Sequence, residues 1–317
     1  GIATLITGRE NALEIMRNAD AAMYAAKRQG KGRYEVFAPK MQVAVAQRLE
    51  LAGEMRRGVE RGEFTVHYQP IVRLGDGSID SMEALARWHP PRRGLVLPRE
   101  FIPEAEENGQ IAAIGRHVLE QACRQARAWQ DAGPPGQAPG LSVNVSARQF
   151  RDPALPKLVV DTLSATGLDA SALTIEITET TIMEDTETAM ERLQHLKSLG
   201  IRLAIDDFGT GYSSLSYLRR LPVDILKVDK SFVDEICAGG QALALARVIM
   251  SIGHTLRLAT VAEGVEGTAQ AEALERLGCE VAQGFHFARP LAPEDVAGWL
   301  TEHRGTSDQA DIAISAA

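Results

Sequence analysis

The sequence predicts an α/β fold, a closed (β/α)8 barrel of the TIM type with a small α/β unit at its N-terminus, and three observations support this prediction. Strand-like and helix-like segments alternate over about 250 residues, as expected for a parallel sheet covered by helices. The 317 residues are 45% apolar and 24% charged, which is an ordinary globular composition. Acidic residues interrupt or follow several of the apolar strand-like segments. An open doubly wound sheet is the structural alternative.

The first 38 residues are predicted to form a separate small unit. Residues 1–7 suit a short strand, residues 11–29 place apolar side chains at helical spacing, and residues 34–37 suit a second strand. Because one helix and two strands bury little surface alone, the simplest interpretation is an N-terminal decoration of the main domain. Residues 39–62 are predicted to be a linker with a lead-in helix over 41–61, which ends at Gly62.

The main domain is predicted over residues 63–302. Its strand candidates are 64–68, 79–88, 141–146, 173–178, 202–206, 225–228, 260–262 and 281–286. Amphipathic helical stretches lie between most of them, such as 111–132, 187–199 and 241–256. Residues 303–317 are expected to be a loose C-terminal tail.

Charge and cysteine content exclude several classes of function. The net charge of −8, from 34 basic and 42 acidic residues, argues against binding of a DNA or RNA duplex, which needs a basic surface. Cys123, Cys237 and Cys279 lie far apart, which argues against a disulfide framework and favours the cytoplasm. No run of about 20 apolar residues predicts a membrane span. Because the first residue is Gly1, a longer protein anchored to a membrane through other segments stays open.

Polar side chains stand inside or at the end of five predicted strands. A carboxylate in an apolar strand costs several kcal/mol of desolvation unless something offsets that cost. An ion pair with a buried arginine would explain one such residue, but the C-terminal ends of barrel strands converge on one mouth. Several carboxylates there would repel one another unless a cation lies among them. The candidates are Glu83, Asn144, Glu176, Asp206, Asp207 and Glu263.

All of these candidates are oxygen donors, and no histidine has the spacing of a metal ligand. Such a set favours Mg²⁺ or Mn²⁺ over zinc or copper, with Ca²⁺ as an inhibitory mimic. The adjacent Asp206 and Asp207 suggest two ions, because both side chains can reach the mouth where the backbone turns at a strand end. Two ions about 3.5–4 Å apart serve phosphoryl transfer by in-line attack of a bound water.

Lys227 is the only lysine inside a predicted apolar strand. It either pairs with a core carboxylate, Asp229 or Asp207, or lies at the attacking water or the phosphate, and the acidic cluster favours the second interpretation. Residues 207–214 form a glycine-bearing loop, interpreted as a mobile lid or dimer contact or, more simply, as a plain turn. The signatures of a P-loop and of serine or cysteine nucleophiles are absent, so we expect no covalent intermediate.

The sequence also resembles a known family. Glu83-Ala84-Leu85, followed by Arg87 and Trp88, resembles the signature that names the EAL-domain phosphodiesterases of bacteria. The match continues in order through 68–71, 144–146, 149–150, 176–179, 206–211, 227–229, 262–266 and 283–285. One of these motifs would be weak support, whereas the ordered set, spread between residues 44 and 300, is specific.

The resemblance implies hydrolysis of cyclic di-GMP to linear pGpG. It assigns one metal to the residues matching Glu83, Asn144, Glu176 and Asp206, and the second metal to those matching Asp206, Asp207 and Glu263. The implied catalytic residues are Lys227, which positions the attacking water, Glu263, Asp207 and Glu83. The implied substrate-binding residues are Gln69, Leu85, Arg87, near a phosphate, and Gln283. The implied loop-supporting residues, in a region that often lies at the interface of a homodimer, are Glu179, Phe208, Gly209, Thr210 and Gly211.

Residues 17–27 and 32–34 resemble the last part of a GGDEF, or diguanylate cyclase, domain. The substrate-binding loop of such a domain is absent from this chain, so cyclase-like and sensory domains would lie upstream in a longer protein.

Three functions follow as hypotheses: an active metal-dependent phosphodiesterase, a catalytically silent cyclic di-GMP receptor, and a dimerisation module. The complete ligand set favours the first, because silent members of the family typically lose a ligand or the loop motif.

Overall fold

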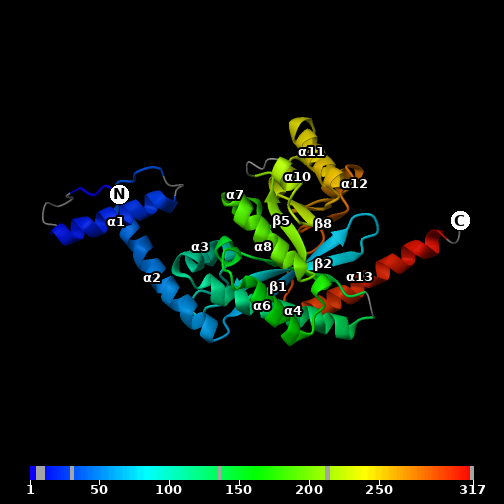
Figure 1. Cartoon of the computed structure of the whole chain (residues 1–317), viewed down its shortest axis with the longest axis horizontal. Helices are drawn as coiled ribbons and strands as arrows, with labels where there is room; N and C mark the ends of the chain where they lie inside the picture. Colours follow the sequence, from blue (N-terminus) through cyan, green and yellow to red (C-terminus); the bar gives the residue numbers. More distant parts are fainter. Residues whose placement is uncertain (5–10, 29–31, 135–136, 211–214, 315–317) are drawn as a thin grey trace.

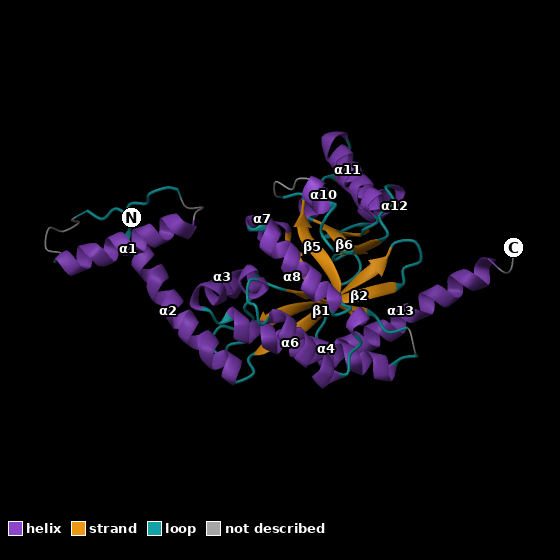
Figure 2. Ribbon diagram, in the orientation of Figure 1, coloured by secondary structure: helices purple, strands orange, loops and turns teal. Residues whose placement is uncertain are grey.

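The computed structural model describes residues 1–4, 11–28, 32–134, 137–210 and 215–314. Figures 1 and 2 show the path of the chain. The eight strands are β1 (Phe64–Arg73), β2 (Ile79–Trp88), β3 (Gly140–Asn144), β4 (Leu173–Thr178), β5 (Arg202–Phe208), β6 (Ile225–Val228), β7 (Ala259–Ala262) and β8 (Val281–Gln283). The first helices are α1 (Ala12–Arg28), α2 (Pro39–Glu60), α3 (Pro98–Asn108), α4 (Ile111–Ala132), α5 (Ala147–Phe150), α6 (Leu155–Thr166) and α7 (Glu179–Glu184). The later helices are α8 (Thr186–Ser198), α9 (Leu215–Leu218), α10 (Lys230–Asp234), α11 (Gly240–Leu256), α12 (Thr268–Arg276) and α13 (Pro293–Ile314).

The strands close into a barrel in sequence order, which confirms the predicted fold class. The pairs from β2 to β8 are parallel, whereas β1 runs antiparallel to both β2 and β8. The reason is the short connection, because only residues 74–78 join β1 to β2, and parallel strands need a crossover of a dozen or more residues. In this turn Asp76 Oδ1 accepts hydrogen bonds from the backbone and the hydroxyl of Ser78.

Alternation along the strands separates an outer from an inner set of side chains. The outer set packs against the helices and includes Phe64 and Trp88, whose rings stack with their centroids 5.4 Å apart. Further down the barrel lies a smaller apolar cluster of Ile71, Ala204, Ile225, Val261 and Val281. Two residues beyond four of these, on the same face of each strand, stand Asp206, Lys227, Glu263 and Gln283. The polar site therefore lies next to a layer of apolar side chains inside the barrel.

The helical shell agrees with the predicted periodicity. The stretch predicted at 111–132 is helix α4, in which the buried Ile111, Ile114 and Val118 recur at helical spacing. The stretches predicted at 187–199 and 241–256 correspond to α8 and α11, each within one residue at either end. The helices lie around the strands (Figure 2), and because β2 to β8 are parallel, their carboxyl ends meet at one mouth of the barrel.

The N-terminal unit extends away from the barrel on helix α2 (Figure 1). An isolated parallel bridge between Ile2 and Val36 replaces the two predicted strands within the described residues. Gln42 Nε2 on α2 donates to Asn18 Oδ1 on α1 at 2.6 Å. The hydroxyl of Tyr24 on α1 donates to a carboxylate oxygen of Glu107 on α3, which ties the unit to the barrel.

The C-terminal segment, expected to be a loose tail at residues 303–317, is helical as far as the structure describes it. Helix α13 continues to Ile314, past Gly305. The residues beyond Gly305 include Gln309, Ala310 and Ala313, which favour a helix, and no proline. Within the described residues, no helix combines the length and apolar character needed to span a lipid bilayer.

Candidate active site

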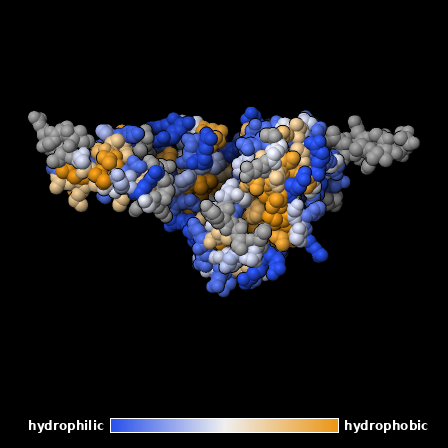
Figure 3. Space-filling view, turned by 90° about the horizontal axis from the view of Figure 1, so that it is seen from above, coloured by the Kyte–Doolittle hydropathy of each residue, from blue (hydrophilic) through white to orange (hydrophobic). Residues whose placement is uncertain are grey.

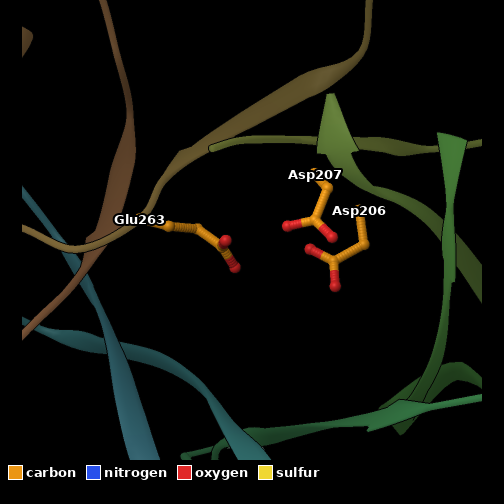
Figure 4. A group of neighbouring side chains, drawn as sticks. All are labelled: Asp206, Asp207 and Glu263. Carbon is orange, nitrogen blue, oxygen red and sulfur yellow. The ribbon is translucent and has the colours of Figure 1, made fainter. Parts of the chain in front are cut away.

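Three carboxylates from two strands point toward one another at the mouth of the barrel (Figure 4). Asp206 and Asp207 lie at the end of β5, and Glu263 follows β7. One oxygen from each of these side chains lies within 4.8 Å of one from each of the others. Glu263 is distant in the sequence from the two adjacent aspartates, so the closed barrel brings it beside them.

The backbone at the end of β5 explains how two adjacent aspartates reach the same space. The pairing of β5 with β6 is irregular between Ile205 and Phe208. Asp207 has a φ of 54°, a left-handed conformation that aspartate adopts more readily than most residues. The turn redirects the Asp207 side chain, which in a regular strand would point away from Asp206.

Lys227 lies at the centre of the acidic cluster and is 1% exposed. Its ammonium nitrogen is 2.6 Å from Glu263 Oε1, 2.7 Å from Glu176 Oε2, 3.2 Å from Asp206 Oδ1 and 3.7 Å from Glu83 Oε1. The prediction that a structural Lys227 would pair with Asp229 or Asp207 was therefore wrong. Asp229 instead accepts a hydrogen bond from the backbone of Ser231 at the start of α10.

A network of amides holds Glu83 from the other side. Asn144 Nδ2 donates to Glu83 Oε1 at 2.5 Å, and Gln283 Nε2 donates to Glu83 Oε2 at 2.6 Å. Gln283 Nε2 also lies 3.1 Å from Gln69 Oε1, and Gln69 Nε2 donates to the carbonyl of Ala288. Both oxygens of Glu83 are thus oriented before any ligand arrives.

Burial and the neighbouring charges shift the pKa values of the cluster in different directions. Burial lowers the pKa of Lys227, but the surrounding carboxylates outweigh this effect and raise it well above its ordinary value. Burial raises the pKa of Glu263 to about 8 and raises that of Glu176 well above its ordinary range, in both cases against the opposing effect of Lys227. Burial and the neighbouring carboxylates raise the pKa of Asp207. For Glu83, burial is outweighed by Lys227 and by the amide hydrogen bonds, so its pKa is lowered.

These residues fit divalent cations with oxygen ligands. Four carboxylates lie within 3.7 Å of a single ammonium, and a fifth, that of Asp207, lies beside Asp206 and Glu263, so acidic side chains outnumber the basic one in the cluster. Glu176 Oε1 is buried and has no hydrogen-bond partner among the described residues, whereas the buried Asp206 Oδ1 has the Lys227 ammonium at 3.2 Å. Because buried polar oxygens are nearly always satisfied, Glu176 Oε1 marks a place for a ligand, and carboxylate sets suit Mg²⁺ or Mn²⁺.

The loop after Asp207 is held from below by Glu179. The side chain of Glu179 is 1% exposed, and its Oε2 accepts a hydrogen bond from the backbone of Gly209 at 2.8 Å. Gly209 has a φ of 99°, and a Cβ there would lie 2.7 Å from the ring of Phe232. Phe208 is buried, and the Thr210 hydroxyl donates to the Asp207 carbonyl at 2.9 Å. The predicted loop residue Gly211 lies outside the described residues.

Two cavities open from the cluster. The first, of about 360 Å³, is lined by Gln69, Glu83, Asp206, Lys230, Glu263, Gly264, Glu266, Gln283, Gly284 and Phe285. The second, of about 500 Å³, reaches from Asn144 and Asp206 along Leu85 toward α3 and α4. Arg87, predicted near a phosphate, is 8% exposed, and its Nη1 donates to the Ala86 carbonyl.

The structure brings three further residues to the first cavity, to which the sequence pattern assigns no role: Lys230, Glu266 and Phe285. Glu266 and Phe285 lie within the family motifs, but the pattern does not distinguish them from ordinary loop residues. Phe285 is 51% exposed, and the guanidinium carbon of Arg289 lies 4.4 Å from the centre of its ring. A large exposed aromatic ring directly after Gly284 is the signal that could have identified it.

An eight-stranded barrel with an acidic, oxygen-only mouth defines a class of enzymes suited to divalent metal ions. Residues 52–290 match the EAL domain, and the chain belongs to the EAL domain family. The chain is 42% identical over 296 residues to the "Bifunctional diguanylate cyclase/cyclic di-GMP phosphodiesterase MucR" of Pseudomonas aeruginosa, covering 93% of this chain and 43% of that protein. It is 42% identical over 287 residues to the "Oxygen sensor protein DosP" of Escherichia coli, covering 90% of this chain and 36% of that protein.

Solved structures are similar over the barrel. The structure described as "PaMucR Phosphodiesterase, c-di-GMP complex" has a TM-score of 0.75 and 42% identity, and the match covers 78% of this chain and 99% of that one. The EAL domain of Mycobacterium smegmatis DcpA has a TM-score of 0.64 and 33% identity, with 76% and 97% covered. The chain spans less than half the length of the curated relatives MucR and DosP.

Proposed function

We propose that this barrel hydrolyses cyclic di-GMP to linear pGpG. The observation that carries the proposal is the convergence of all six predicted oxygen ligands and Lys227 at the mouth, in a chain 42% identical to a phosphodiesterase solved with c-di-GMP. Two Mg²⁺ or Mn²⁺ ions would supply positive charge to the phosphate and to the attacking water.

The side chains divide this task among them. Glu83, Asn144, Glu176 and Asp206 would hold one ion, and Asp206, Asp207 and Glu263 the other. Lys227 carries an ammonium that can donate a hydrogen bond to the attacking water and stabilise charge on the phosphate. Gln283 orients Glu83 through its 2.6 Å hydrogen bond and, with Gln69, lines the cavity for substrate.

A catalytically silent receptor for cyclic di-GMP is the second hypothesis. It predicts binding without turnover. The ligand set argues against this hypothesis, because every position that matches a metal ligand of the family carries Asp, Glu or Asn in this chain.

Turnover separates the two hypotheses. The protein is incubated with cyclic di-GMP and Mg²⁺ or Mn²⁺, with Ca²⁺, or with excess EDTA, and pGpG is measured. We expect pGpG only with Mg²⁺ or Mn²⁺ and none from Asp206→Asn. Binding of cyclic di-GMP without pGpG in any condition would favour the receptor, and full activity in EDTA would contradict the metal-dependent mechanism.

We also propose that the barrel forms a homodimer through α9 and α11. Tyr217 is 41% exposed, Leu245 is 45% exposed and Val248 is 55% exposed on these helices. Figure 3 looks onto the side of the molecule where α11 lies and shows a band of apolar surface there. Light scattering should report a dimer for the wild type and a monomer for Val248→Asp. The control Val160→Asp, at a 42% exposed position on α6, should stay dimeric.

We propose further that residues 1–38 are the end of a cyclase-like domain, with sensory domains upstream in a cytoplasmic or membrane-anchored parent protein. The similarity to MucR covers 93% of this chain and therefore extends beyond residues 52–290. Leu13 and Met16 on α1 are 70% and 66% exposed, as expected for a surface that packs against more polypeptide. Hydrogen exchange of α1 should slow in a longer polypeptide that includes the upstream region.

A further inference from the structure

We propose that Lys230 binds the second phosphate of a cyclic dinucleotide, the one that is not cleaved. This inference rests on the proposed function and adds a residue that selects a substrate with two phosphates. Lys230 is the first residue of α10 and lies at the edge of the cavity that contains Glu83, Asp206 and Glu263.

The charge of this cavity makes Lys230 distinctive. Among the described residues that line it, Lys230 is the single basic side chain, whereas four are glutamate or aspartate. A cyclic dinucleotide carries two negative phosphates, and the metal ions can neutralise only the one placed over them. The second phosphate would meet Glu266 and other carboxylates unless a cation lies beside it.

The geometry holds Lys230 at this position. Its Nζ lies 2.7 Å from Asp234 Oδ1 and 2.7 Å from Glu266 Oε1. Its aliphatic carbons pack on Gly264, where an added Cβ would approach them to 2.3 Å. The side chain is 44% exposed, so the ammonium keeps access to the cavity while two carboxylates hold it. Both hydrogen bonds raise the pKa of Lys230, which keeps it charged.

A bracing role is the competing explanation, because Lys230 also ties α10 to the loop that carries Glu263 and Glu266. The two roles differ in their consequences. A brace would support metal binding by Glu263, so its loss would weaken metal affinity. A phosphate ligand would affect the affinity for the dinucleotide and leave metal affinity unchanged.

The test compares Lys230→Met, Lys230→Arg and Asp234→Asn with the wild type. The affinity for cyclic di-GMP is measured with Ca²⁺ in place of Mg²⁺ to suppress turnover, and the affinity for Mn²⁺ is measured separately without nucleotide. Loss of one partly exposed charge-assisted contact should weaken dinucleotide binding by about fivefold in Lys230→Met. Lys230→Arg should restore most of the affinity. Asp234→Asn releases Lys230 from one competing carboxylate and should leave binding equal or tighter.

Lys157→Met is the matched control, because Lys157 also pairs with an aspartate four residues later, Asp161, on the exposed face of a helix. It should bind cyclic di-GMP as the wild type does. Unchanged dinucleotide affinity in Lys230→Met, or a parallel loss of Mn²⁺ affinity, overturns the inference. Absence of cyclic di-GMP binding by the wild type would instead remove the proposed function on which the inference rests.

Discussion

Replacing Lys227 with methionine tests the electrostatic design of the site. Lys227→Met keeps most of the buried volume and removes the ammonium that contacts Glu176 and Glu263 at 2.7 and 2.6 Å. Removing one partner of a buried ion pair typically costs about 3–5 kcal/mol, because the other charge is left buried and unpaired. The midpoint of thermal unfolding shifts by about 2–4 °C per kcal/mol for a domain of this size, so the midpoint of metal-free Lys227→Met should be roughly 10 °C below that of the wild type.

The loss of stability in Lys227→Met should increase as the pH rises. Because burial raises the pKa of Glu263 to about 8, the folded protein binds a proton that the unfolded chain releases above its ordinary value near 4.5. The contribution of Glu263 to stability therefore falls as the pH rises between about 4.5 and 8. Glu176, whose pKa is also raised, acts in the same direction. Lys227 opposes the rise in the pKa of Glu263 and lowers the pKa of Glu83, so both pKa values should rise in Lys227→Met, and the destabilisation should be larger at pH 8 than at pH 5.5.

Metal ions provide the second arm of the experiment. Thermal unfolding is measured for the wild type and Lys227→Met at both pH values, with EDTA and with Mg²⁺. If divalent ions occupy the cluster, Mg²⁺ should restore most of the lost stability while activity stays low. The surface variant Lys157→Met should match the wild type throughout. An equal loss of stability in all four conditions would refute the idea that repulsion among these carboxylates causes it.

Three further predictions follow from the geometry. Glu179→Ala should lower turnover about tenfold by releasing the Gly209 backbone while Mn²⁺ affinity stays unchanged, and equal turnover with equal loop protection in hydrogen exchange would contradict this role. Mn²⁺ affinity should rise by up to about tenfold per pH unit below pH 8, because binding displaces the proton of Glu263, and titrations of Glu263→Gln should show a weaker dependence. Gly264→Ala should destabilise the protein more than Gly167→Ala, since both glycines have φ near 70° but only Gly264 lies against another side chain, and equal unfolding midpoints would refute this.

The barrel was predictable because its main signal is local. Each βα unit carries its own pattern, and a count of such units is enough to suggest closure. The direction of β1 was not read from the same pattern, because a strand looks alike in either direction. The information lay in the five residues 74–78, too few for a crossover and rich in turn residues such as Asp76 and Gly77.

The members of the acidic cluster were predictable for a different reason. A carboxylate such as Glu176 stands out in an apolar strand because its desolvation demands a partner. The identity of each partner was not predictable, since it depends on how neighbouring strands are staggered. Lys227 thus contacts Glu176 and Glu263 from other strands, while the nearby Asp229 caps α10. Lys230 was missed because an exposed lysine at a helix start carries no comparable signal.

The contacts of Lys227 indicate that its structural and functional interpretations do not exclude each other. The ammonium already neutralises part of the cluster, and its shortest contacts are to Glu176 and Glu263, two proposed metal ligands. Divalent ions entering the cluster would compete with Lys227 for the same oxygens, because the single negative charge of a carboxylate cannot fully balance both an ammonium and a metal ion. The ions would then weaken these ion pairs and free the ammonium to donate toward a water or a phosphate. The structural and functional roles therefore belong to the same side chain before and after metal binding, and Lys227→Met should disturb both.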